Sequence, residues 1–179
     1  MRVISGKLKG RKIIGYDIEG TRPTMDRVKE SLFGSIQEYI DNSVVLDLFA
    51  GSGNLGIEAL SEGAKYAYLV DSNEKAIKTI HNNVKKIGIT DIEVIHSDYK
   101  KALKKFNIKF DLIFLDPPYQ TNYIEESIKL IIENDLLNNN GLIVCESDML
   151  DKIIYSSELK KVKEKKYGDK YIVLLQKVW

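Results

Sequence analysis

The sequence predicts an α/β fold, a doubly wound Rossmann-like sheet that is mostly parallel and ends in an antiparallel C-terminal hairpin. Beyond residue 43, short apolar runs alternate with helical segments, which is typical of parallel strands joined by crossover helices. A glycine-rich turn follows the first of these strands. Near the C-terminus, the runs over 158–166 and 170–178 flank Tyr167-Gly168-Asp169. That tripeptide is typical of a hairpin turn, so the sheet should end with an antiparallel pair.

The first 43 residues follow a different pattern. MRVISG and RKIIGYD resemble two short strands, so residues 1–20 are expected to form a small basic β-hairpin appendage to one domain over residues 21–179. Thr24 is a suitable N-cap for a helix. The apolar side chains after it recur every fourth residue, as on one face of a helix: Val28, Leu32, Ile36 and Ile40.

From residue 44 onward, each apolar run is predicted to be a buried strand and each amphipathic run a helix. The expected strands cover 44–50, 66–71, 92–97, 110–116 and 141–147. The expected helices cover 54–62, 72–88, 98–105 and 122–136. The helix over 72–88 has the clearest ends, with Ser72 or Asn73 as N-cap and Gly88 as C-cap.

Composition excludes several classes of protein. With 179 residues, 44% of them hydrophobic, the chain has enough apolar material for a core. No run approaches the roughly 20 apolar residues of a membrane helix, and MRVISGKLKGRK lacks the apolar stretch of a secretory signal. The single cysteine, Cys145, excludes an internal disulfide and a cysteine-only zinc site. We expect a cytoplasmic protein without a metal, and nothing demands more than a monomer.

The net charge of +1 is unevenly distributed. Residues 1–30 and 155–179 each carry a net charge of +4, which leaves −7 for the middle of the chain. All four arginines lie within the first 27 residues. Two basic ends suit a polyanionic partner, although solvated lysines on a lysine-rich protein would give the same pattern.

The turn after the first strand matches a nucleotide-binding fingerprint. Residues 51–56 read G-x-G-x-x-G, and Asp71 closes the next strand 20 residues after Gly51. Glycines let the backbone approach a ligand closely, and a carboxylate at the second strand end can accept hydrogen bonds from ribose hydroxyls. Asp47, four residues before Gly51, would repel a pyrophosphate but could hold an ammonium group. This favours S-adenosylmethionine over NAD.

A second motif, Asp116-Pro117-Pro118-Tyr119, closes the fourth strand. Two prolines stop the strand and fix the backbone, so the Asp116 carboxylate and the Pro117 carbonyl could face one place. These two acceptors match the two N–H donors of an exocyclic amine, and Tyr119 could stack on a planar base. The motif predicts methyl transfer to an unpaired nucleobase amine.

The chain resembles the S-adenosylmethionine-dependent amino-methyltransferases with an Asp/Asn-Pro-Pro-Tyr motif, and more narrowly the RsmD family of bacterial 16S rRNA guanine-N2 methyltransferases. The resemblance covers the whole chain. It is carried by MRVISG at the start, TRPTMDRVKESLF over 21–33, the loop over 47–56 and the tetrapeptide over 116–119. It implies methylation of the N2 amine of a guanine, guanine 966 of the family's target, in small-subunit rRNA or the assembling 30S particle.

The resemblance also implies roles for individual residues. Those implied to bind the cofactor are Thr24, Arg27, Asp47, Gly51, Gly53, Asp71 and Asp98. Those implied to hold the guanine are Asp116, Pro117 and Tyr119. The basic hairpin and the stacking ring would bind RNA through Arg2, Lys7, Lys9, Arg11 and Tyr119. From the residues alone, Asp98 fits an adenine contact and a helix N-cap equally. Glu146, near the end of the fifth strand, could face the substrate cleft, but a structural role is favoured.

Other functions remain open at this stage. A DNA adenine-N6 methyltransferase uses the same tetrapeptide, but this chain has no separate target-recognition segment. A protein glutamine methyltransferase would usually carry Asn at position 116. A non-catalytic RNA-binding module or an NAD oxidoreductase belongs to another class, and binding of S-adenosylhomocysteine or NAD would distinguish these.

Overall fold

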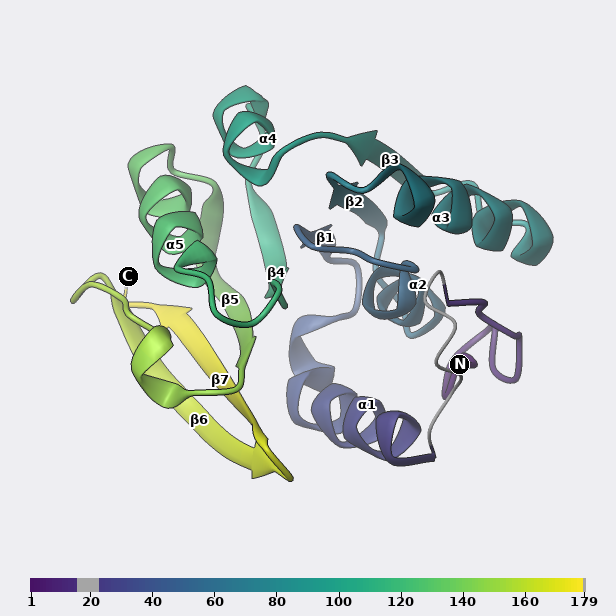
Figure 1. Cartoon of the computed structure of the whole chain (residues 1–179), viewed down its shortest axis with the longest axis horizontal. Helices are drawn as coiled ribbons and strands as arrows, with labels where there is room; N and C mark the ends of the chain where they lie inside the picture. Colours follow the sequence, from purple (N-terminus) through teal and green to yellow (C-terminus); the bar gives the residue numbers. More distant parts are fainter. Residues whose placement is uncertain (16–22, 179) are drawn as a thin grey trace.

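A computed structural model describes residues 1–15 and 23–178 (Figure 1). Its seven strands form one sheet in the order β3-β2-β1-β4-β5-β7-β6. The strands are β1 (Val44–Asp47), β2 (Tyr66–Asp71), β3 (Ile92–His96), β4 (Phe110–Leu115), β5 (Leu137–Ser147), β6 (Leu159–Tyr167) and β7 (Lys170–Lys177). Strands β1 to β5 are parallel, and β7 runs antiparallel to both β5 and β6. The mixed, doubly wound sheet expected from the sequence is confirmed.

Helices cover both faces of this sheet (Figure 1). They are α1 (Pro23–Ile36), α2 (Asn54–Ser61), α3 (Glu74–Ile87), α4 (Tyr99–Lys105) and α5 (Tyr123–Glu133), with short 3-10 turns η1 (Gln37–Tyr39) and η2 (Leu150–Lys152). Helices α1 to α3 pack on one face, where Phe33 and Phe114 are in ring contact. Helices α4 and α5 pack on the other, around Leu103 and Ile128. The sheet is therefore buried on both sides, as a parallel sheet requires.

Strand β7 brings its first residues to the edge where β5 ends. Because the two strands are antiparallel, Glu146 pairs with Ile172 and Ser147 pairs with Tyr171. Lys170 begins β7 and therefore lies at the carboxyl edge of the parallel strands. Ligands of open α/β sheets bind at this edge.

The ends of α3 are where the sequence predicts them, whereas α1 begins one residue before the predicted N-cap. Asn73 caps α3, since its side chain accepts hydrogen bonds from the backbone N–H groups of Lys75 and Ala76, and Gly88 ends the helix in the left-handed region. Helix α1 begins at Pro23, so Thr24 lies inside its first turn and not at its N-cap. Proline suits the first helical position because the missing N–H would have no helical partner. None of the described helices is long and apolar enough to cross a membrane.

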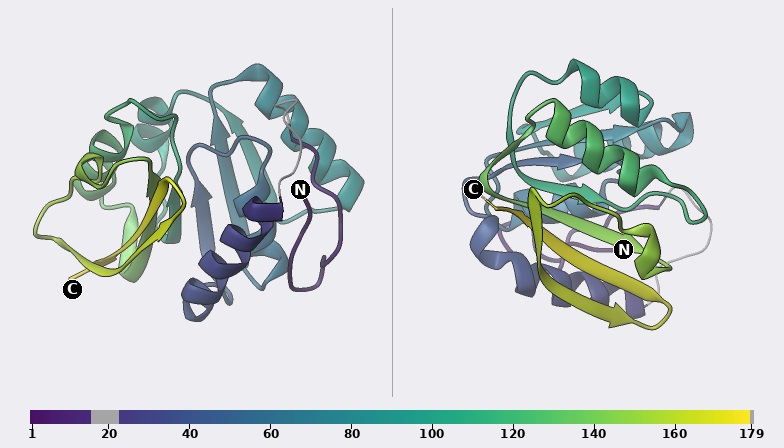
Figure 2. Two further views of the ribbon diagram at one scale, coloured as in Figure 1. Left: turned by 60° about the horizontal axis from the view of Figure 1, so that its bottom comes forward. Right: turned by 90° about the vertical axis from the view of Figure 1, so that its left-hand side faces the viewer.

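The expected N-terminal β-hairpin is not seen. Residues 16–20 of that prediction lie outside the described residues. Within residues 1–15, one antiparallel bridge joins Arg2 to Lys12, and no strand forms. The physical reason is that the backbone N–H groups of Ile4, Ser5 and Leu8 bond to side chains of α2 and do not extend a ladder. The segment lies beside α2, at the opposite end of the molecule from the β6–β7 hairpin (Figures 1 and 2).

Candidate active site

The register of the strands places a row of ionisable side chains on one face of the sheet. Residues paired between neighbouring strands share a face, and so do residues two apart on one strand. Asp47 pairs with Leu69 and with Phe114. Asp71 and Asp116 lie two residues beyond these partners, so all three aspartates lie on the same face.

The same reasoning extends the row across two more strands. Leu115 at the end of β4 pairs with Cys145 on β5. The residues that follow them, Asp116 and Glu146, therefore lie side by side. Glu146 pairs with Ile172, two residues from Lys170. We call Asp71, Asp47, Asp116, Glu146 and Lys170 the active-site row. It lies at the carboxyl edge on the face that α1 to α3 cover.

Asp71 holds the glycine loop in place. Its Oδ2 accepts a hydrogen bond from the Gly51 N–H (2.9 Å) and its Oδ1 accepts one from the Asn73 N–H (2.8 Å). The loop needs its glycines because Gly51 (φ 59°) and Gly53 (φ 87°) adopt the left-handed region. The second strand end and the loop therefore form one rigid unit, and each Asp71 oxygen keeps a lone pair for another donor.

The side chain of Asp47 is buried beneath this loop. Its exposed fraction is 1%, and neither carboxylate oxygen has a hydrogen-bond partner within the described ranges 1–15 and 23–178. Burial raises the pKa of Asp47 to about 7, and the nearby Gly56 and Phe49 backbones offset only part of this rise. A buried carboxylate without partners is costly, so it marks a place where a cationic ligand would be stabilised.

Asp116, Glu146, Lys170 and Tyr119 form one contacting cluster at the other end of the row. Glu146 Oε1 lies 3.0 Å from Lys170 Nζ, and the Asp116 and Glu146 carboxyls are in hydrogen-bond contact. Burial, and then Glu146, raise the pKa of Asp116 well above its usual range. The Lys170 ammonium lies 5.8 Å from the centre of the Tyr119 ring, which is exposed and available for stacking.

Other predicted site residues take simpler positions. Asp98 is the N-cap of α4, where its Oδ1 accepts hydrogen bonds from the Lys100 (2.9 Å) and Lys101 (3.2 Å) N–H groups. Pro117 is buried, and Arg27 is exposed on α1. The Thr24 side chain lies outside the described part of the chain. The basic residues predicted to bind RNA are all exposed, namely Arg2, Lys7, Lys9 and Arg11.

Two residues of the row were not predicted as functional from the sequence. For Glu146 the sequence favours a structural role over a position facing the substrate cleft, and it does not single out Lys170. The alternation of Leu142, Val144 and Glu146 along β5 could have placed Glu146 on the face of the other acids. The position of Lys170 beside Glu146 depends on the pairing of β7 with β5, and this pairing is seen only in the folded sheet.

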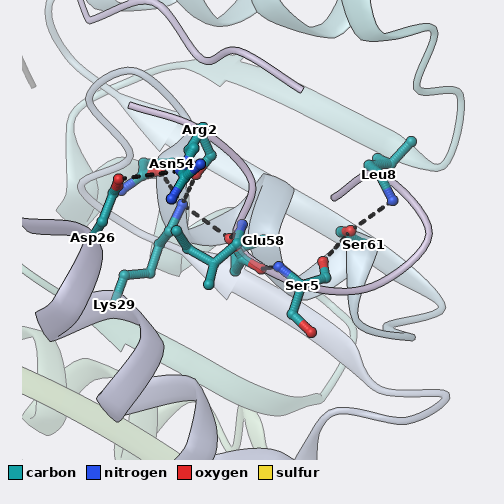
Figure 3. A network of polar contacts seen from close by, with 9 residues as sticks. Arg2, Ser5, Leu8, Asp26, Lys29, Asn54, Glu58 and Ser61 are labelled. Atoms are coloured by element: carbon teal, nitrogen blue, oxygen red, sulfur yellow. Dashed lines mark hydrogen bonds and ion pairs between the residues drawn. The ribbon is translucent and has the colours of Figure 1, made fainter. Parts of the chain in front are cut away.

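A second cluster of charges joins the N-terminal segment to the core (Figure 3). Lys29 on α1 and Glu58 on α2 are both buried and form an ion pair of 2.9 Å. The Lys29 ammonium also donates to the Arg2 carbonyl (2.6 Å) and to Asn54 Oδ1 (2.7 Å). Its three donors are therefore all used. We call this cluster, together with the Glu58 contacts below, the N-terminal network.

Glu58 is equally well satisfied. Its Oε1 accepts a hydrogen bond from the Ile4 N–H (2.8 Å) and its Oε2 accepts one from the Ser5 N–H (3.1 Å). Glu62 lies in hydrogen-bond contact with Glu58, and burial, followed by this contact, raises the pKa of Glu62 to about 8. One turn further along α2, Ser61 Oγ bonds the backbone of Ser5 (2.6 Å). The network fixes residues 1–8 against α2.

The fold and site together define the class of this protein. A seven-stranded sheet with an antiparallel β7 between β5 and β6, a glycine loop after β1, and Asp-Pro-Pro-Tyr after β4 are the features of a Rossmann-like methyltransferase. A family model described as "Conserved hypothetical protein 95" matches residues 1–176. The chain belongs to this family, which is the RsmD family that the sequence resembles.

Individual relatives agree with this assignment. The chain is 38% identical to ribosomal RNA small subunit methyltransferase D of Haemophilus influenzae, over 94% of this chain and 89% of that protein. It is 39% identical to the protein of the same name from Buchnera aphidicola, over 85% of this chain and 80% of that one. The solved structure of yhhF from Escherichia coli has a TM-score of 0.89 at 32% identity and covers 99% of this chain and 97% of its own.

Proposed function

We propose that this protein transfers a methyl group from S-adenosylmethionine to the exocyclic N2 amine of a guanine in small-subunit rRNA, with guanine 966 of the family's target as the specific site. The observation that carries the proposal is the active-site row. It puts the glycine loop and Asp47 one strand away from Asp116 and the Pro-Pro-Tyr turn. Cofactor and base would therefore meet at the junction of β1 and β4.

The charge of the row suits this cofactor. S-adenosylmethionine carries an ammonium and a sulfonium group and no phosphate, and the row holds four carboxyls against one lysine. Asp47 is buried and has no hydrogen-bond partner in the part of the chain that the structure describes, so it is the natural acceptor for the ammonium, either directly or through water. A pyrophosphate would face the same carboxyls at a large electrostatic cost.

We further propose positions for the rest of the cofactor. Gly51 and Gly53 would line its methionine end, Asp71 would bind the ribose and Asp98 would bind the adenine. Thr24 and Arg27 would border the same site.

The residues after β4 would prepare the amine. The Asp116 carboxylate and the Pro117 carbonyl accept its two N–H bonds, while Tyr119 stacks on the base. These contacts localise the lone pair that is otherwise delocalised into the ring, and the fixed geometry supplies the orientation that methyl transfer needs. When bound, the cofactor supplies a methyl group with electrophilic character. As the new N–C bond forms, the amine gives up one proton, and Asp116 or water accepts it.

An RNA substrate is supported by charge and by the relatives. Arg2, Lys7, Lys9 and Arg11 are exposed on the N-terminal segment, and more lysines lie on the β6–β7 hairpin at the opposite end of the molecule. Phosphates could therefore be bound on both sides of the acidic row. The relatives cited above are named for small-subunit rRNA. We propose that the enzyme acts in the cytoplasm as a monomer, on rRNA or on the assembling 30S particle.

Labelled S-adenosylmethionine tests the proposal directly. The purified protein is incubated with small-subunit RNA, with 30S particles lacking the modification, and with DNA. We expect label in RNA or particles, recovered as N2-methylguanosine by nucleoside mass mapping. Label in DNA adenine, or binding of NAD without binding of S-adenosylhomocysteine, would refute the proposal.

A further inference from the structure

The half of the active-site row beyond Asp116 has no role in the reaction as described so far. Glu146 and Lys170 come from β5 and β7, and the Lys170 ammonium lies 5.8 Å from the centre of the Tyr119 ring. Glu146 Oε1 lies 3.0 Å from Lys170 Nζ, and the pairing of Leu115 with Cys145 places Asp116 beside Glu146, which raises the pKa of Asp116. With both carboxyls ionised, the groups along the edge of the sheet are an acceptor (Asp116), an acceptor (Glu146) and a donor (Lys170).

This order is complementary to one nucleobase. The Watson–Crick edge of guanine presents the N2 amine, the N1–H and the O6 carbonyl, which is donor, donor, acceptor. We propose that Asp116, Glu146 and Lys170 read this edge together, with Glu146 accepting from N1–H and Lys170 donating to O6. The inference rests on the proposed function and deepens it, since it assigns the choice of guanine to Glu146 and Lys170.

Other bases with an exocyclic amine do not fit the row. Adenine and cytosine both carry a ring nitrogen with a lone pair next to the amine. That lone pair would face the Glu146 carboxylate, so two acceptors would be left opposed and desolvated. A site built to hydrogen-bond its substrate rejects an analogue that lacks the partner group by large factors. The Asp-Pro-Pro-Tyr turn alone offers no such discrimination, because its two acceptors contact only the amine and Tyr119 could stack on any base.

A purely structural ion pair explains the cluster less well. The Lys170 side chain is 45% exposed, and ion pairs of this kind contribute little to stability. Glu146 also lies beside the half-buried Asp116, where two ionised carboxyls repel each other. The fold would be easier to stabilise with an uncharged residue at position 146. A placement that costs stability beside the reacting amine is expected of a substrate-binding group.

A modified base separates this role from others. A small-subunit RNA fragment is made with guanosine or with 2-aminopurine at the target nucleotide. 2-Aminopurine keeps the amine but has a lone pair at N1 and no O6. We expect kcat/KM of the wild-type protein to be at least about 100-fold lower with 2-aminopurine. In Glu146→Gln, whose amide can donate to N1, the two substrates should differ by less than about 10-fold.

Lys170→Met gives an independent reading. It should lower kcat/KM for guanosine by about 10-fold and leave that for 2-aminopurine unchanged, since 2-aminopurine has no O6 to lose. The matched control is Glu164→Gln. Glu164 lies on β6, where it pairs with Lys161 on the exposed edge of the sheet, and its substitution should leave the preference of the enzyme at the wild-type value.

The outcomes are distinct. Equal use of both bases by the wild-type protein, or an unchanged preference in Glu146→Gln with a normal melting temperature, would overturn the assignment. A protein inactive on guanosine RNA would fail the proposed function itself, and the assignment of the row with it. An active protein that prefers guanosine, loses most of this preference in Glu146→Gln and part of it in Lys170→Met, and keeps it in Glu164→Gln, supports both.

Discussion

The N-terminal network and the active-site row both bury charge, but they differ in how that charge is satisfied. In the network, all three donors of Lys29 and both oxygens of Glu58 have partners. In the row, neither carboxylate oxygen of Asp47 has a hydrogen-bond partner among the described residues. Burial raises the pKa of Asp47 and Asp116 there. The comparison teaches that satisfied buried charge fixes structure, whereas unsatisfied buried charge marks the place of a ligand.

The largest effect on methyl transfer should come from replacing Asp116, the residue of the active-site row next to the reacting amine. We expect Asp116→Ala to lower methyl transfer at least about 1000-fold, which corresponds to about 4 kcal/mol, because the amine loses its acceptor. Binding of S-adenosylhomocysteine, measured by calorimetry, should stay within a few-fold of the wild-type protein. A parallel loss of cofactor binding would contradict the role given to Asp116.

Substitutions in the N-terminal network should lower the free energy of unfolding and leave the methyl-transfer reaction unaffected. Glu58→Leu leaves the Lys29 ammonium buried and unpaired, so we expect a loss of about 3–5 kcal/mol in the free energy of unfolding, measured in urea. The matched control is the double variant Lys29→Met/Glu58→Leu, which leaves no unpaired charge and should be more stable than the single variant. A single variant within 1 kcal/mol of the wild-type protein would show that the pair does not fix the segment.

Replacing Asp47 should raise the free energy of unfolding of the free protein, whereas replacing Glu58 lowers it. Asp47→Asn removes a carboxyl whose pKa is raised to about 7, so the free protein should gain about 1–3 kcal/mol at pH 8. Ionising Asp47 destabilises the folded state, and this cost grows with pH from the unfolded pKa of the carboxyl up to about pH 7. Near pH 4 the carboxyl is protonated in the fold, so the gain in the free energy of unfolding from Asp47→Asn should vanish there. The variant should also bind S-adenosylhomocysteine about 10–100-fold more weakly. A less stable variant at pH 8 would contradict the contrast.

The smallest effect gives the baseline for both regions. Lys163 on β6 donates to Ser35 Oγ at 2.9 Å in an exposed contact. We expect Lys163→Ala to change the free energy of unfolding by less than about 0.5 kcal/mol, as measured by the same urea titration. A larger change would mean that surface contacts rival the buried ones, and the difference between the two regions would lose its meaning.

Most of the sheet could be predicted from the sequence because its signals are local. Apolar runs mark the buried strands, and Asn73 and Gly88 mark the ends of α3 through their own side chain and backbone. The glycine loop and the Asp-Pro-Pro-Tyr turn are also local, since each lies within a few consecutive residues.

The parts that failed depend on contacts between distant segments. MRVISG has the composition of a strand, but its backbone bonds to Glu58 and Ser61, which lie more than 50 residues away. The role of Lys170 follows from the pairing of β7 with β5, and only the folded sheet sets that register. Local pattern therefore gives the elements, and tertiary contact decides which side chains meet.

The position of β7 has a consequence for the order of assembly. In the sheet, β6 touches β7 alone, although it comes first along the chain. β6 therefore has no neighbouring strand in the sheet until β7 has formed. We expect β6 and β7 to form a hairpin first and then to pack onto β5 as a unit. Docking then delivers Lys170 to the side of Glu146 in one step, and a chain with that hairpin detached would keep its glycine loop but lack the base-facing lysine.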